Sequence, residues 1–317
     1  MLRGVMFWIF KKKKNDISSQ SSVTSHLDDP NRPELEIRQV GPYEIIAPIG
    51  SGGMGTVYKA IDRGKDLTVA VKVLDPRFDE DPKRRKQDFL GREVMIAASL
   101  NHPNIIRMDK TIHEAIDNTG RTRRCIVMEF IDGYNLKKHI NDRDLNIRQM
   151  IEICVKLCHG LDYLHQHGIV HRDVKPANFL FSKDGKLVKI VDFGLSKTNA
   201  TWQGWLMKET GGTRIYMSPE QILKKSLDAR SDIFSFGLTI YELFSGKHPC
   251  EANDAKIVTR QLVDPNYKFV PPSSHNHQLT PALDRIILKS LRRKIEHRYQ
   301  SMTELLLDLK RATESRI

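Results

Sequence analysis

The sequence predicts an α+β fold, with strands in the early part of the chain and long helices in the remainder. β-branched and aromatic residues dominate residues 43–47, 56–58 and 68–74, which is the composition of strands. Apolar residues then recur at helical spacing over 89–100 and again over about 147–166. These segments order the chain as strands first and helices afterwards.

Residues 1–42 are expected to form a flexible leader and linker. The apolar run Val5–Phe10 is too short to span a bilayer, which needs about 20 residues. The basic run Lys11–Lys14 follows the apolar run, whereas a signal peptide carries its charge in front. Two interpretations stay open: a peripheral anchor on anionic membranes through residues 5–14, or a disordered leader. Residues 15–41 are rich in Ser, Asp and Pro and are typical of a linker.

The charge balance is basic, with 51 Lys and Arg against 39 Asp and Glu, a net charge of +12. Residues 1–42 hold seven basic and five acidic residues (+2), so residues 43–317 carry the other +10. The basic clusters are short and no recognition motif accompanies them, so we expect no nucleic-acid binding. Four cysteines without metal-site spacing favour a reducing, cytoplasmic location, with membrane association at the inner face as the alternative.

A glycine-rich motif joins the first two predicted strands, with Gly50, Gly52 and Gly55 in Gly-x-Gly-x-x-Gly spacing. In a dinucleotide-binding unit a helix would follow these glycines. Here Thr56 and the next residues favour a strand, so the sequence predicts a hairpin. Bare glycine backbone allows N–H groups to approach phosphate oxygens, although an ordinary turn remains the alternative.

The strand over 68–74 contains Lys72 among aliphatic residues. A buried ammonium is costly without an anionic partner. Glu93 falls inside the helix predicted over 89–100, so we expect Lys72 to pair with Glu93 and to reach phosphates as well.

A short polar loop follows the helix predicted over 147–166. Asp173 and Asn178 lie on this loop, and Asp192 follows a further predicted strand. Carboxylate and amide oxygens are donors that Mg²⁺ prefers. Lys175 is close enough in sequence to face the same space. Such groups suffice for phosphoryl transfer, which needs positioning, cations and a group to orient the nucleophile.

The ordered set of motifs resembles the protein kinase family over residues 43 to about 312. The motifs are the glycine-rich loop, Val69-Ala70-Val71-Lys72, helical Glu93, His171-Arg172-Asp173, Asp192-Phe193-Gly194 and Ser218-Pro219-Glu220. The resemblance implies a two-lobed fold: a small β-rich N-lobe with one main helix, at about 43–131, and a larger, mostly helical C-lobe, at about 132–312. We therefore expect one catalytic domain behind a short leader.

The resemblance also implies a role for each site residue. Asp173 would orient the substrate hydroxyl, Lys175 would stabilise the transferring phosphoryl group, and Lys72, held by Glu93, would orient the ATP phosphates. Asn178 and Asp192 would hold Mg²⁺, with Mn²⁺ as the alternative ion. The residues implied to bind ATP are Ile49, Gly50, Ser51, Gly52, Gly53, Met54, Gly55, Thr56, Val57, Ala70, Lys72, Glu129 and Ile131. Residues 129–131 would form the hinge strand, whose backbone meets adenine. Met128 would precede this strand as its gatekeeper residue.

The loop containing Lys175 and the pair Gly212-Thr213 are similar to those of serine/threonine kinases. The segments Met217-Ser218-Pro219-Glu220-Gln221 and Arg298-Tyr299-Gln300-Ser301-Met302 look most like those of bacterial eukaryotic-like (Hanks-type) kinases. This likeness implies ATP-dependent phosphorylation of protein Ser/Thr hydroxyls, including autophosphorylation. Arg172 is typical of kinases in which a phosphate orders the activation segment. The candidate acceptors here are Thr198, Thr201 and Thr210, but Trp202, Trp205, Leu206 and Met207 depart from the pattern of relatives, so loop control is left open.

Three other functions are alternatives: a pseudokinase scaffold that binds ATP without efficient transfer, a small-molecule kinase, and a nucleic-acid-binding protein. The pseudokinase is disfavoured because Lys72, Asp173 and Asp192 are all present. The small-molecule kinase is disfavoured by the segment from Gly212 to Glu220. Two further features imply architecture: Asp232 is expected to accept hydrogen bonds from the catalytic-loop backbone, and Glu220 is expected to pair with Arg298.

Overall fold

The structure is a computed structural model that describes residues 36–52, 55–76, 89–193, 214–250, 252 and 254–314. Several expectations concern residues outside these ranges. They are the membrane anchor at 5–14, Gly53, Met54, Gly194, the threonines Thr198, Thr201, Thr210 and Thr213, Gly212, and the apolar residues Trp202, Trp205, Leu206 and Met207.

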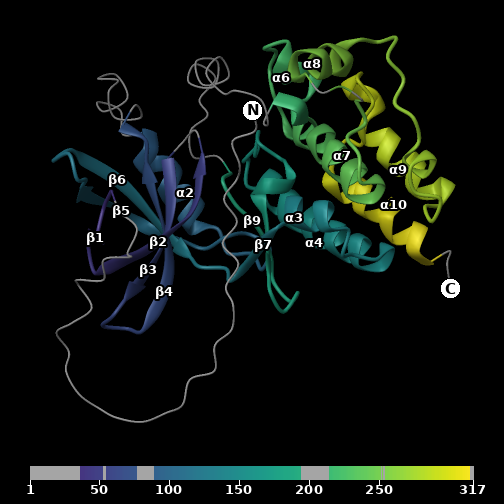
Figure 1. The fold of residues 1–317 in the computed structure, drawn as a ribbon. Helices are drawn as coiled ribbons and strands as arrows, with labels where there is room; N and C mark the ends of the chain where they lie inside the picture. Colours follow the sequence, from purple (N-terminus) through teal and green to yellow (C-terminus); the bar gives the residue numbers. More distant parts are fainter. Residues whose placement is uncertain are drawn as a thin grey trace. The chain divides into compact units, whose positions relative to one another are not determined.

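The N-lobe is built on a six-stranded antiparallel sheet in the order β1-β2-β3-β4-β6-β5, drawn in purple to blue in Figure 1. Its strands are β1 (Gln39–Val40), β2 (Tyr43–Gly52), β3 (Gly55–Asp62), β4 (Leu67–Leu74), β5 (Met108–Ile116) and β6 (Thr122–Glu129). The three strands expected before residue 75 are confirmed, and two of them are longer than composition indicated: β2 continues to Gly52 and β3 continues to Asp62.

The side chains of strand β4 alternate between two hydrophobic clusters. Val69, Val71 and Val73 enter one hydrophobic cluster with residues of β1 and β2. Leu74 belongs to the other cluster, which continues into the C-lobe. Lys72 lies on the same face of β4 as Leu74. Because both faces of the strand are covered, Lys72 is only 4% exposed.

The packed part of the chain begins before Tyr43. Ile37 is 1% exposed and Val40 is fully buried, and both belong to the cluster that covers the sheet. Strand β1 pairs with β2 through Val40 and Tyr43. The expected boundary at residues 42 and 43 therefore differs from the structure, which packs residues 36–42 onto the N-lobe.

Helix α2 (Phe89–Ser99) lies where the apolar spacing predicted a helix. Val94 and Ala97 are buried, and the helix packs against β5. The side chains of Phe89, Leu90, Arg92 and Glu93 lie outside the described part of the structure, so the expected pairing of Glu93 with Lys72 stays a prediction.

The C-lobe is mostly helical (Figure 1). Its elements are α3 (Leu136–Asp142), α4 (Ile147–Gln166), η2 (Pro176–Asn178), η3 (Arg214–Tyr216), α6 (Pro219–Ile222), α7 (Ala229–Ser245), α8 (Ala255–Val263), η4 (Pro272–Ser274), α9 (Pro281–Ser290), η5 (Ile295–His297) and α10 (Met302–Glu314). Helix α4 has the predicted bounds. It begins at a capping box of Asn146 and Gln149 and is followed by Gly168 in the left-handed conformation. In α7 every residue from Ser231 to Ser245 is buried.

A small sheet lies beside these helices, in the order β7-β8-β9, with β7 (Gly133–Asn135), β8 (Phe179–Ser182) and β9 (Val188–Ile190). The loop at 104–107, which enters β5 of the N-lobe, is attached to β9. Ile106 N–H donates to Ile190 O at 3.1 Å, and Ile190 N–H donates to Asn104 O at 2.8 Å. The side chain of Asn104 donates to Val188 O at 2.9 Å.

The four cysteines are buried and carry free thiols. Among the described helices, none combines the length and the apolar character that a membrane span requires.

Candidate active site

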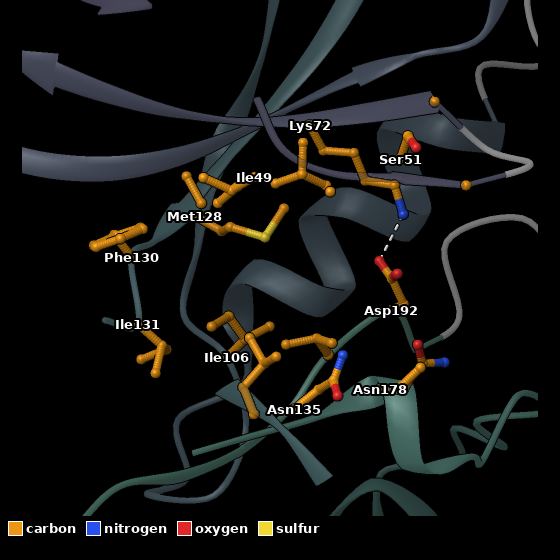
Figure 2. Close-up of a pocket in the computed structure, with 18 of the residues that line it drawn as sticks. Ile49, Ser51, Lys72, Ile106, Met128, Phe130, Ile131, Asn135, Asn178 and Asp192 are labelled. Carbon is orange, nitrogen blue, oxygen red and sulfur yellow. Dashed lines mark hydrogen bonds and ion pairs between the residues drawn. The ribbon is translucent and has the colours of Figure 1, made fainter. Parts of the chain in front are cut away.

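A cavity of about 360 Å³ lies between the glycine-rich hairpin and the loop that follows α4. Figure 2 shows side chains of both lobes directed into it. Its lining includes Ile49, Gly50, Ser51, Gly52, Gly55, Val57, Ala70, Lys72, Met128, Glu129, Phe130, Ile131, Asp173, Lys175, Asn178 and Asp192. Residues predicted from separate motifs thus meet at one site, whose volume is that of a small-molecule pocket.

The roof of the cavity is the hairpin of β2 and β3, in which Gly52 pairs with Gly55. Gly55 has a φ of 133°, and a Cβ there would lie 2.0 Å from Val73 O, so only glycine fits. A Cβ on Gly50 or Gly52 would meet no atom within 4 Å. The backbone at these two positions therefore stays open to a ligand, as a phosphate site requires.

Lys72 and Asp192 face each other across the cavity, with Lys72 Nζ 2.6 Å from Asp192 Oδ1 (Figure 2). Burial raises the pKa of the Asp192 carboxyl, but the charge and hydrogen bond of Lys72 outweigh burial, so this pKa lies below its ordinary value. Asp192 has a φ of 60°, a left-handed conformation in which aspartate is among the more tolerated residues. The sequence did not assign this ion pair.

The loop that follows α4, from His171 to Asn178, is held by Asp232 at the start of α7, which is 1% exposed. Its carboxylate accepts hydrogen bonds from the backbone N–H of His171 at 2.7 Å and of Arg172 at 2.8 Å, as expected. His165 Nε2 lies 2.8 Å from the same carboxylate. Burial raises the pKa of Asp232, but the contact with His165 and the backbone donors outweigh burial and lower it. The loop is therefore fixed by a carboxylate that stays ionised.

Asp173 is the centre of a polar group on this loop. Lys175 Nζ lies 3.1 Å from Asp173 Oδ2. Asn178 Nδ2 donates to Asp173 O at 2.8 Å and to Asp173 Oδ2 at 3.1 Å. Because the amide nitrogen of Asn178 is directed at Asp173, the amide oxygen points elsewhere, and Figure 2 shows Asn178 beside Asp192. An amide oxygen and a carboxylate that line the same cavity are donors that suit a Mg²⁺ ion.

The lining also includes residues that the sequence analysis did not assign: Ile106, Asn135, Ala177, Leu180 and Val191. Asn135 caps α3 by accepting a hydrogen bond from Lys138 N–H, a role that its position before Leu136 and Ile140, spaced by one helical turn, could have indicated. Conversely, Thr56 does not line the cavity. Strand alternation directs Gly55 and Val57 to the cavity and Thr56 away from it. Gly53, Met54 and the side chain of Glu93 lie outside the described residues.

Glu220 and Arg298 form the expected buried ion pair, with two N–O distances of 2.7 and 2.8 Å. The side chains are 3% and 0% exposed. Gln221 Nε2 donates to Arg172 O at 2.8 Å, which connects this pair to the catalytic loop.

Comparisons with known proteins agree with this geometry. A family model described as "Protein kinase domain" matches residues 43–308. Serine/threonine-protein kinase PknB of Mycolicibacterium smegmatis is 39% identical over 277 residues, which cover 86% of this chain and 43% of that protein. The chain thus spans less than half the length of this relative. The crystal structure of the Mycobacterium tuberculosis PknI kinase domain has a TM-score of 0.66 at 24% identity, with 88% of this chain and 99% of that chain covered. The crystal structure of Rad53 1-466 in complex with AMP-PNP has a TM-score of 0.66 at 27% identity, with 84% and 64% covered.

Proposed function

The chain belongs to the protein kinase domain family, and we propose on that premise that it is a Mg²⁺-dependent serine/threonine protein kinase. It transfers the γ-phosphoryl group of ATP to protein hydroxyl groups and phosphorylates itself as well. One observation supports the proposal most: Lys72, Asp173, Lys175, Asn178 and Asp192 line a single cavity beneath an open glycine backbone.

ATP is the proposed ligand because the cavity combines an apolar wall with a cationic end. Ile49, Val57 and Ala70 form part of the wall, and Lys72 lies at the other end. The backbone of Glu129 and Ile131 offers hydrogen-bonding groups for an adenine ring. The relative Rad53 was crystallised with AMP-PNP, an adenine nucleotide, which supports the same choice.

The ion pair of Lys72 with Asp192 neutralises two charges in a site of low dielectric. In the proposal, phosphate oxygens replace Asp192 as partners of Lys72, so that Asp192 and the amide oxygen of Asn178 become available to Mg²⁺. The ion, or Mn²⁺ in its place, supplies positive charge to the phosphates. The residues of the chain supply orientation.

Asp173 is the proposed acceptor for the substrate hydroxyl. One of its carboxylate oxygens, Oδ2, is already held by Lys175 and Asn178, which fixes the plane of the group. The other oxygen can accept a hydrogen bond from an incoming Ser or Thr hydroxyl. Lys175 then adjoins both the nucleophile and the transferring phosphoryl group, whose developing charge it offsets.

The proposed substrates are proteins with Ser or Thr acceptors, because the named relative is a serine/threonine-protein kinase and Lys175 follows that pattern. A cytoplasmic location and a membrane contact through residues 5–14 remain part of this proposal.

The Asp173→Asn variant tests the proposal. We expect a loss in kcat of about 10²- to 10⁴-fold for phosphate transfer to a protein acceptor, with ATP binding retained. Asp184→Asn, on the exposed hairpin between β8 and β9, is the matched control and should keep wild-type turnover. Equal turnover by Asp173→Asn would remove the proposed role of Asp173. ATP binding without transfer in the wild type would instead favour the pseudokinase scaffold.

A further inference from the structure

A buried arginine that the proposed mechanism does not use lies in β6. The side chain of Arg123 is 7% exposed. Its Nε and Nη2 donate to Leu74 O at 3.0 and 2.8 Å, and its Nη1 pairs with Asp117 at 3.2 Å and with Glu36. A buried guanidinium is costly unless it is paired, so these partners decide how the segments around it are placed.

The two carboxylates have different roles. Asp117 belongs to the turn between β5 and β6 and accepts hydrogen bonds from the backbone N–H of Thr119 and Arg121 at 2.9 and 3.0 Å. Asp117 is thus a local partner that balances the charge of Arg123. Glu36 adds a second carboxylate, and its side chain is 35% exposed. Since one carboxylate already neutralises Arg123, the contribution of Glu36 is to attach its own segment.

That segment is held firmly. Asn118 N–H donates to Glu36 O at 2.8 Å, and Ile45 N–H donates to Arg38 O at 3.0 Å. Ile37, next to Glu36, is 1% exposed. The described start of the chain is therefore attached to the sheet at Glu36, Ile37 and Arg38.

On its other side Arg123 holds the end of the strand that carries the cavity lysine. Leu74 is the last residue of β4, two positions after Lys72. Two donors of one guanidinium share the Leu74 carbonyl oxygen, which restrains both the position and the direction of the strand end. Lys72 is therefore followed within two residues by a backbone group that Arg123 holds in place.

We propose that Glu36 and Arg123 are a positioning pair, through which the segment that precedes the domain sets the alignment of Lys72 and hence the affinity for ATP. The inference rests on the proposed function only in taking ATP as the ligand of the cavity. A partner or surface that engages the leader would change ATP affinity by drawing Glu36 away from Arg123.

The test uses Glu36→Ala and Glu36→Gln in the full chain, because substitution of Arg123 would leave Asp117 buried without its cation. Calorimetric titration with ATP and Mg²⁺ should give a dissociation constant raised about fivefold in Glu36→Ala. The value of kcat at saturating ATP should stay near that of the wild type. Glu44→Gln, which breaks the exposed ion pair of Glu44 with Arg63 on the same sheet, is the control and should leave ATP affinity unchanged.

Amide hydrogen exchange tests the coupling between Glu36 and β4 without any ligand. Exchange at Val73 and Leu74 should be faster in Glu36→Ala than in Glu44→Gln. A lowered melting temperature with unchanged ATP affinity and unchanged exchange at β4 would show a merely structural role and overturn the inference. If the wild type bound no ATP, the proposed function would fail, and the exchange at β4 would still decide the coupling.

Discussion

Lys189 in β9 is buried and forms an ion pair with the half-buried Glu129 at the end of β6, with Lys189 Nζ 2.7 Å from Glu129 Oε1. The ammonium also donates to Ile105 O at 3.2 Å, and the same carboxylate oxygen accepts from Arg107 N–H at 2.8 Å. The lysine side chain is 6% exposed. One residue thus joins the strand that leads to Asp192, the loop that enters β5, and the edge of the cavity at Glu129.

Removal of this ammonium should be costly. We expect Lys189→Met to lower the free energy of unfolding by about 1.5 kcal/mol, because the half-buried Glu129 carboxylate and the Ile105 carbonyl oxygen would lose the ammonium that they contact. Urea denaturation measures the loss. The double variant Lys189→Met, Glu129→Met should recover much of it, since no charge is then left unpaired. A single variant as stable as the wild type would contradict the buried pair.

Acid should weaken the pair of Glu220 and Arg298. Burial raises the pKa of Glu220, but the hydrogen bond and charge of Arg298 outweigh burial and hold it below its ordinary value of 4.5. A depressed folded-state pKa means that the stabilisation is present above 4.5 and is lost as the pH falls through the folded-state pKa. Glu220→Gln should therefore cost about 3 kcal/mol at neutral pH and progressively less on acidification. Urea denaturation of the wild type and of Glu220→Gln, from neutral pH down to acidic pH, measures this difference in the free energy of unfolding. A difference that does not change with pH would exclude the linkage.

Asp192→Asn should separate metal binding from nucleotide binding. Asparagine tolerates the left-handed backbone of this position, so the loop should keep its conformation. Loss of the carboxylate should lower kcat by about 10³-fold and abolish the gain in ATP affinity on addition of Mg²⁺. Chelation of the metal in the wild type is the matched comparison and should give the same ATP affinity. A variant that still responds to Mg²⁺ would place the ion elsewhere.

The cysteines should be inert in the native protein. Burial raises the pKa of both Cys125 and Cys250 to about 12, and it also raises the pKa of Cys154 and Cys158. Since thiolates are the reactive form, a thiol reagent near pH 8 should label no cysteine quickly before unfolding and all four after it. Rapid native labelling at any position would reveal local opening there.

The regular elements were predictable because local pattern determines them. Helix α4 has the expected bounds, since its apolar spacing, its cap at Asn146 and Gly168 after its end all agree. The hairpin between β2 and β3 was predictable for a similar reason: the residue types after Gly55 favour a strand over a helix.

Contacts between distant segments were harder to predict. Lys72 and Asp192 are 120 positions apart, and the sequence contains several other carboxylates that could equally be the partner of Lys72. Burial of Ile37 was unexpected because Ser, Asp and Pro surround it on the N-terminal side, although the sheet supplies the apolar cover. Lys189 lies in a strand of three residues, too short for alternation to indicate a buried charge.

The attachment of the loop at 104–107 to β9 decides whether the chain can be divided. A cut after residue 131, at the expected boundary between the lobes, would leave Ile106 N–H and Asn104 O without their partner Ile190. It would equally uncover an edge of β9, with unpaired backbone groups open to association with other chains. Fragments separated there should recombine in trans rather than persist as independent folded units. The contact of β9 with residues 104–107 is therefore an interface through which the two halves of a split-protein reporter could reassemble.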